Sequence, residues 1–145
     1  MGSRRVSVSL AGWWGGVGVL LVALAGCVGR DNPESAAREF VRAALSGEYA
    51  LVFQRLTPGD QSRLRELARR ATAQGGGRQR FGPEDMLSSS IPSELRHGLA
   101  RVERVSEAGD SAKVRLVDSS GKYTEVWRLK RHEGRWRVLL ESINR

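Results

Sequence analysis

Residues 112–117 read Ala-Lys-Val-Arg-Leu-Val and alternate apolar with mostly basic side chains. A period of two predicts a β-strand that buries one face and exposes the other. Residues 123–130 and 135–140 repeat the pattern, each with a tryptophan in the apolar series. The apolar series predicted to face inward comprises Ala112, Val114, Leu116, Tyr123, Trp127, Leu129, Trp136, Val138 and Leu140.

Short glycine-containing segments separate these stretches, at residues 108–110, 119–121 and 132–134. Connections of this length join antiparallel neighbours, so the three strands are expected to form a meander. Residues 99–107 add an earlier strand whose alternation is imperfect, because Val102 and Val105 fall on opposite faces. A β-bulge between them would reconcile that pattern.

The first half of the chain has helical periodicity instead. Asn32 is placed to cap a helix that starts at Pro33, with apolar residues at helical spacing up to Leu45 and Gly47 ending it. A short helix over residues 49–56 follows, and Thr57 is expected to cap a third. That third helix is predicted to turn four residues inward: Leu64, Leu67, Ala68 and Ala71. Helices followed by a meander predict one α+β domain over residues 33–145, with the helices packed on one sheet face.

The N-terminus has the regions of an export signal in order. Arg4 and Arg5 precede an uncharged apolar run, and Leu24-Ala25-Gly26-Cys27 closes it at the only cysteine of the chain. This pattern resembles the signal peptide and lipobox of bacterial lipoproteins. The resemblance implies cleavage after residue 26, a lipid on Cys27 and a tether over residues 27–32. It places the protein in the cell envelope, outside the cytoplasm, on the inner or the outer membrane.

An uncleaved membrane-spanning helix is the alternative, since about 20 apolar residues span a bilayer. Glycines at positions 12, 15, 16 and 18 weaken such a helix. The export route, Sec or twin-arginine, stays open.

The order of elements, with Gly109-Asp110-Ser111-Ala112-Lys113-Val114 and Gly134-Arg135-Trp136-Arg137-Val138 near the end, resembles small lipoproteins of the nuclear transport factor 2-like (cystatin-like) superfamily. The resemblance implies a cone-shaped domain with a cavity between sheet and helices. The aromatic residues that would line it are Phe40, Tyr49, Phe53, Tyr123, Trp127 and Trp136. The alternative is that they simply fill a small core.

Charge points to an anionic partner. Without Arg4 and Arg5 the 24 basic residues fall to 22 against 16 acidic ones, and the net charge falls from +8 to +6. The strand alternation places six of these charges on the outer sheet face: Lys113, Arg115, Arg128, Lys130, Arg135 and Arg137. Anionic lipid or an acidic envelope protein is the expected partner, and the alternative is a solvated face on a basic protein. Nucleic acid is not expected, because the face lacks interleaved aromatic residues and the compartment is wrong.

The sequence gives little support for catalysis. His97 precedes the sheet in a segment broken by prolines, and His132 lies at a tight turn. The chain has no metal-ligand cluster and no Gly-x-Ser-x-Gly motif, so no cofactor is expected. The prediction is a non-catalytic binding or assembly domain. The alternative is a cavity enzyme of the same superfamily with isomerase-like or hydrolase-like acid–base chemistry.

Overall fold

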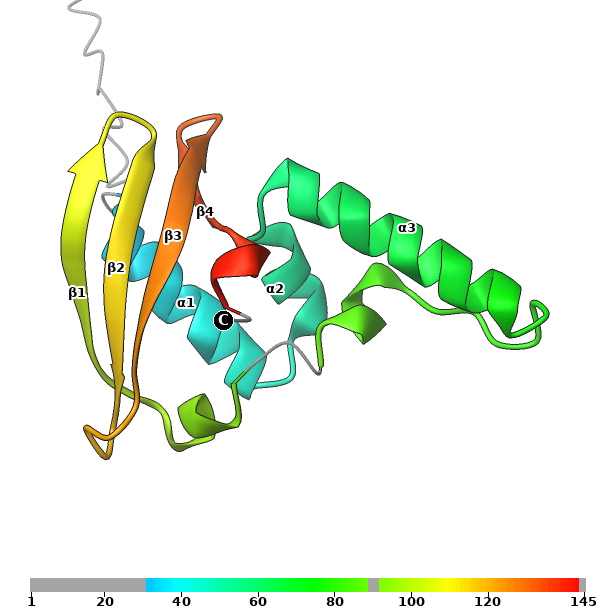
Figure 1. The fold of residues 1–145 in the computed structure, drawn as a ribbon, viewed down its shortest axis with the longest axis horizontal. Coiled ribbons are helices and arrows are strands. Elements are labelled where there is room, and N and C mark those ends of the chain that lie inside the picture. Colours follow the sequence, from blue (N-terminus) through cyan, green and yellow to red (C-terminus); the bar gives the residue numbers. More distant parts are fainter. Residues whose placement is uncertain (1–30, 89–91, 144–145) are drawn as a thin grey trace, which may run out of the picture.

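The computed structural model describes residues 31–88 and 92–143 (Figure 1). Within these residues helices come first and an antiparallel sheet follows. The elements are α1 (Pro33–Leu45), α2 (Tyr49–Gln54), α3 (Pro58–Gln74), the 3-10 turns η1 (Pro83–Met86) and η2 (Ser93–His97), β1 (Leu99–Ala108), β2 (Ser111–Asp118), β3 (Thr124–His132), β4 (Arg135–Val138) and the 3-10 turn η3 (Leu140–Ser142). The predicted α+β layout is confirmed.

The helix ends follow the local signals. The Asn32 side chain accepts a hydrogen bond from the Ser35 backbone N–H at 2.7 Å, which satisfies one of the free donors of the first turn of α1. Gly47 has φ +72° and donates its N–H to the Ala44 carbonyl at 3.1 Å. That left-handed conformation costs glycine little, so Gly47 ends α1 as predicted.

The sheet is a meander in the order β1-β2-β3-β4, with all neighbours antiparallel. The register of β1 against β2 shifts between Arg104 and Ser106, which places a bulge at Val105. The expectation that a bulge would bring Val102 and Val105 to the same face was wrong, because Val102 is buried whereas Val105 is 45% exposed. A second shift follows Leu99. The β1–β2 and β3–β4 turns lie at one end of the sheet and the β2–β3 turn at the other (Figure 1).

The helices do not all lie on the sheet. α1 crosses the face behind β1, β2 and β3 in Figure 1, whereas α3 runs away from the sheet and packs on η1. α2 packs on α1 and η1, so the prediction of three helices on one sheet face was wrong for α2 and α3. Leu64 and Ala68 are buried in the contact between α3 and η1, but Leu67 is 45% exposed. A single small 3-10 turn covers a narrower stripe of α3 than a sheet would.

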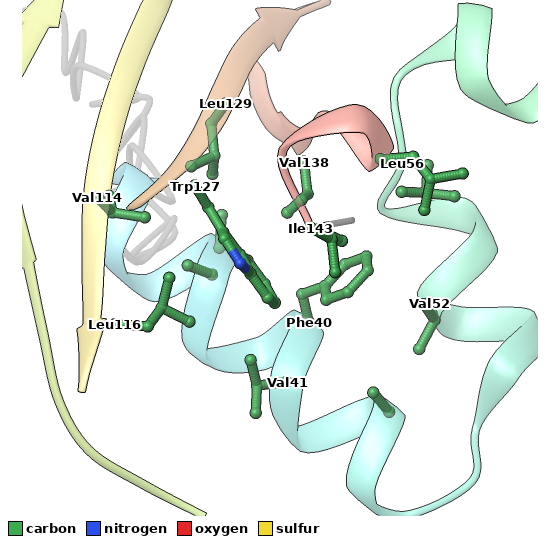
Figure 2. Close-up of a cluster of buried hydrophobic side chains, with 14 of the residues drawn as sticks. Phe40, Val41, Val52, Leu56, Val114, Leu116, Trp127, Leu129, Val138 and Ile143 are labelled. Carbon is green, nitrogen blue, oxygen red and sulfur yellow. The ribbon is translucent and has the colours of Figure 1, made fainter. Parts of the chain in front are cut away.

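The core lies between α1 and the inner face of the sheet. Trp127 projects from β3 toward α1 (Figure 2) and is fully buried. Its ring meets that of Phe40 edge to face, with the centroids 5.5 Å apart. Trp136 is buried in β4, beneath the Arg131 guanidinium at 4.5 Å from its ring centroid. Large aromatic rings thus supply much of the apolar area buried in this small domain.

The predicted lipobox, Leu24 to Gly26, the acceptor Cys27 and the signal segment 1–26 lie outside the described residues. Among the helices that the structure describes, none is long and apolar enough to cross a membrane. The last two residues of the predicted tether are described, and both contact the domain. Asn32 caps α1, and the Asp31 carboxylate accepts a hydrogen bond from the Trp136 backbone N–H at 2.8 Å.

Candidate functional site

Six basic residues lie on the sheet face that points away from α1. In β2, Ala112, Val114 and Leu116 are buried against the helix, so the alternate residues point outward. The same parity holds in β3, where Trp127 and Leu129 are buried. We define the basic face as Lys113, Arg115, Arg128, Lys130, Arg135 and Arg137.

Strand register brings four of these charges directly opposite one another. Lys113 pairs with Arg128 between β2 and β3, and Lys130 pairs with Arg137 between β3 and β4. Directly opposed like charges destabilise an antiparallel pair, by up to about 1 kcal/mol each. The sheet therefore carries a local conflict that opposite charges or polar residues would avoid. Such conflicts in a folded chain are expected where function requires them.

Acidic side chains neutralise only part of the basic face. Arg128 forms an ion pair with Glu141 at 2.7 Å, and a 3.7 Å contact joins Arg115 to Glu103. Both pairs are substantially exposed, and such pairs contribute little. The Arg137 guanidinium donates to the Gln54 carbonyl oxygen. Four members of the basic face have no ion-pair partner among residues 31–88 and 92–143: Lys113, Lys130, Arg135 and Arg137.

The basic face is hollowed toward the end that carries the β1–β2 and β3–β4 turns. A depression of about 270 Å³ opens there, with Lys113, Arg128 and Lys130 along its walls. Ser106 and Ser111 add hydroxyl groups, and Leu139 adds apolar surface. Cations and hydroxyl donors around an apolar floor suit a small anion that is attached to a larger apolar group.

The predicted cavity residues separate into two groups. Phe40, Trp127 and Trp136 are buried and form the core, which agrees with the simpler interpretation that they fill it. Tyr49, Phe53 and Tyr123 are partly buried and pack against that core. Phe53 also lies beneath the Arg65 guanidinium, 5.0 Å from its ring centroid. Burial of this kind gives these rings a role in packing.

Glu125 is a polar residue whose role the sequence did not reveal. Glu125 lies opposite the buried Leu116 in the β2–β3 ladder, so it is on the inner face of the sheet and not on the basic face. One carboxylate oxygen accepts hydrogen bonds from the Trp127 indole N–H, at 2.8 Å, and from the Tyr123 hydroxyl. Burial, and then the hydrogen bond to Glu125, raise the pKa of Tyr123 above its usual value. Glu125 thus satisfies the polar atoms of two aromatic rings at the edge of the core.

A second depression, of about 560 Å³, contains His97 with Glu94, Asp118 and Tyr123. The Asp118 carboxylate accepts from the Ser120 hydroxyl and from the backbone N–H groups of Ser120 and Tyr123. These bonds, the hydroxyl first, lower the pKa of Asp118. In the part of the chain that the structure describes, no carboxylate hydrogen-bonds to the imidazole of His97. Asp118 thus holds the β2–β3 turn.

His132 is exposed at the end of β3, 4.0 Å from the Glu133 carboxylate. No group of three or more potential metal ligands occurs among the described residues. Comparison with known proteins found no matching family model, no similar curated protein and no similar solved structure.

Proposed function

We propose that this protein is a membrane-anchored envelope lipoprotein whose small, non-catalytic domain binds an anionic surface through its basic face. The observation that carries the proposal is the pairing of Lys113 with Arg128 and of Lys130 with Arg137. The fold keeps like charges opposed although this opposes its own stability. Binding of an anionic partner would neutralise these charges, and the loss of repulsion would make binding more favourable.

The anchor rests on the lipobox at Leu24 to Cys27. Stable anchoring needs two acyl chains or one chain and a basic patch, and a lipid on Cys27 together with the basic face would meet this requirement. A Cys27→Ser substitution removes the acceptor thiol, so an unprocessed precursor without lipid is expected. Mass spectrometry of the membrane fraction measures this, and a normally processed, membrane-bound variant would contradict the anchor.

We also propose the nuclear transport factor 2-like superfamily as the finer fold. The helix-first order, the meander and the burial of Trp127 and Trp136 against α1 support it. α3, which leaves the sheet, is the element that departs most from a closed cone. An experimental structure of residues 28–145 would test this placement.

Binding by the basic face is testable without the anchor. In residues 28–145, Arg115, Arg128 and Arg137 are replaced together by Glu, and binding to vesicles with and without anionic lipid is measured by sedimentation. At about 1 kcal/mol per basic residue near an anionic surface, three reversals should abolish binding to the anionic vesicles. A matched control reverses three exposed arginines outside the face, Arg78, Arg80 and Arg96.

The control variant has the same net charge as the test variant, so only the position of the charges differs. Circular dichroism and thermal melting establish that both variants are folded. Equal loss of binding in both variants would show that net charge alone attracts the vesicles. Unchanged binding of the test variant would exclude the basic face.

A further inference from the structure

The chain enters the domain at a fixed point. The Asp31 carboxylate accepts the Trp136 backbone N–H at 2.8 Å, and Asn32 caps α1 next to it. Trp136 lies opposite Arg131 in the β3–β4 ladder, two residues from the Gly134 turn. The segment that precedes Asp31 therefore meets the domain at the end of the sheet that carries the β3–β4 turn.

The distance from this point to the proposed anchor is short. Four Cα–Cα steps join Cys27 to Asp31, and a fully extended chain spans at most about 14 Å over them. If Cys27 carries lipid, as proposed above and as this inference requires, Asp31 lies within about 14 Å of the membrane interface. The Debye length is about 8 Å in physiological salt, so the upper limit for Asp31 is less than two Debye lengths. Charges at this end of the sheet therefore lie within reach of a partly screened headgroup potential.

The basic face is concentrated toward the same end. Lys130 pairs with Arg137 and His132 pairs with Arg135, all within four residues of the β3–β4 turn. The depression lined by Lys113 and Lys130 opens on this part of the face. Asp110 and Glu133 lie in the two turns, so the excess of positive charge lies on the strands and not in the turns.

The opposite end of the sheet, which carries the β2–β3 turn, lies far from Asp31. β3 contains eight steps from Thr124 to His132, or about 26 Å at the rise of an extended strand. Lys122 is exposed in the β2–β3 turn at that far end. The three lysines of the chain are Lys113, Lys122 and Lys130, so two report on the basic face and one on the far end.

We infer that the domain rests on its own membrane by the β3–β4 end of the basic face, with Lys113, Lys130 and Arg135 on anionic phospholipid headgroups. A headgroup phosphate fits the depression between Lys113, Arg128 and Lys130 as the counterion that the two lysines lack, whereas Arg128 already pairs with Glu141. Asp31 is a positioning residue: it holds the tether at β4, so that this end and not the far end approaches the lipid. The anchor supplies proximity, and the charge complementarity supplies orientation.

The test uses the full-length protein, expressed in a bacterial host, purified with its anchor and reconstituted into vesicles of phosphatidylcholine alone or with phosphatidylglycerol. An amine-reactive reagent labels the lysines, and mass spectrometry follows each site. Lys113 and Lys130 should react about fivefold more slowly on the anionic vesicles, the fold-change that corresponds to about 1 kcal/mol per basic residue. The rate at Lys122 should not change.

Two variants probe the positioning role. Asp31→Ala removes the acceptor for the Trp136 N–H, and the selective protection of Lys113 and Lys130 should fall. Asp31→Asn retains an acceptor oxygen and should restore it. Thermal melting and the far-ultraviolet spectrum confirm that each variant is folded.

Each outcome has a distinct meaning. Protein that floats with the vesicles but shows protection at Lys122, or none at Lys113 and Lys130, overturns the orientation and leaves the anchor standing. The same labelling is repeated in native membranes. Protection of Lys113 and Lys130 there, but not on the pure lipid vesicles, overturns the lipid contact in favour of an acidic protein partner. Protein that does not float with vesicles overturns the lipid anchor, and this inference with it.

Discussion

Phe40 of α1 and Trp127 of β3 meet edge to face, with ring centroids 5.5 Å apart and ring planes at 85° (Figure 2). The contact joins the first helix to the third strand, and both rings are fully buried. Edge-to-face pairs contribute about 0.5–1.5 kcal/mol beyond the area they bury. This pair thus ties the helical half of the chain to the sheet.

Replacing Phe40 by Ala should lower the free energy of unfolding by about 3–5 kcal/mol, because the ring leaves a cavity. Chemical denaturation of the full domain measures the change. Val126 lies one residue from Trp127 but is 41% exposed, so Val126→Ala should change stability by less than about 0.5 kcal/mol. A small effect of Phe40→Ala would mean that α1 does not hold the sheet through this contact.

Charge reversal on the basic face should raise the free energy of unfolding and weaken binding to anionic vesicles. Lys130→Glu places a carboxylate opposite Arg137, so unfolding should become harder by about 0.5–1 kcal/mol as repulsion turns to attraction. The same change should weaken binding to anionic vesicles. Lys122→Glu, in the β2–β3 turn, should alter neither quantity. Parallel melting and sedimentation measurements test this, and a variant that loses both stability and binding would refute the expectation.

Asp60 joins α3 to the end of the chain. Its Oδ2 accepts the Thr57 hydroxyl at 2.7 Å and the Leu140 backbone N–H at 3.0 Å, and the side chain is buried. Asp60→Ala leaves a buried N–H without an acceptor and should cost about 2 kcal/mol. Asp60→Asn offers one oxygen to the same two donors, so its cost should be smaller. Urea denaturation compares the two, and equal losses would show that the charge matters more than the acceptor.

The pair of Tyr123 and Glu125 predicts a change at alkaline pH. The folded pKa of Tyr123 lies above the usual value of 10.0, so its contribution to stability is complete below about pH 10 and is lost as pH rises through the folded pKa. Glu125→Gln removes the nearby negative charge and should return the pKa toward 10. Burial remains, so the return should be partial.

Absorbance at 295 nm follows this ionisation. The chain has two tyrosines, and a Tyr49→Phe background isolates Tyr123. A titration that does not move on Glu125→Gln would show that burial alone sets the pKa of Tyr123.

Local signals determined most of the secondary structure from the sequence. Asn32 and Thr57 start helices because their side chains satisfy backbone donors a few residues away. Gly47 and Gly134 permit a backbone conformation that other residues resist. Alternation gave the two faces of the sheet, and with them the membership of the basic face, because side chains on a strand alternate by geometry.

Contacts between residues that are far apart in the sequence could not be predicted from such local signals. The sequence predicted that Leu67 is buried, yet α3 leaves the sheet and exposes it. It offered no sign that Glu125 accepts from two aromatic rings or that Asp60 reaches Leu140. These depend on which elements meet and at what register, and a charged residue gives the same local pattern whether it is solvated or paired.

The sequence by itself therefore determined the element order and the strand faces, because each depends on residues close together in the chain. Only the tertiary structure decided which charges oppose one another and where the tether meets the sheet. Lys113 and Arg128 are 15 positions apart and become neighbours only through the β2–β3 register. Asp31 and Trp136 are 105 positions apart, and their hydrogen bond sets the end of the sheet at which the described chain enters the domain.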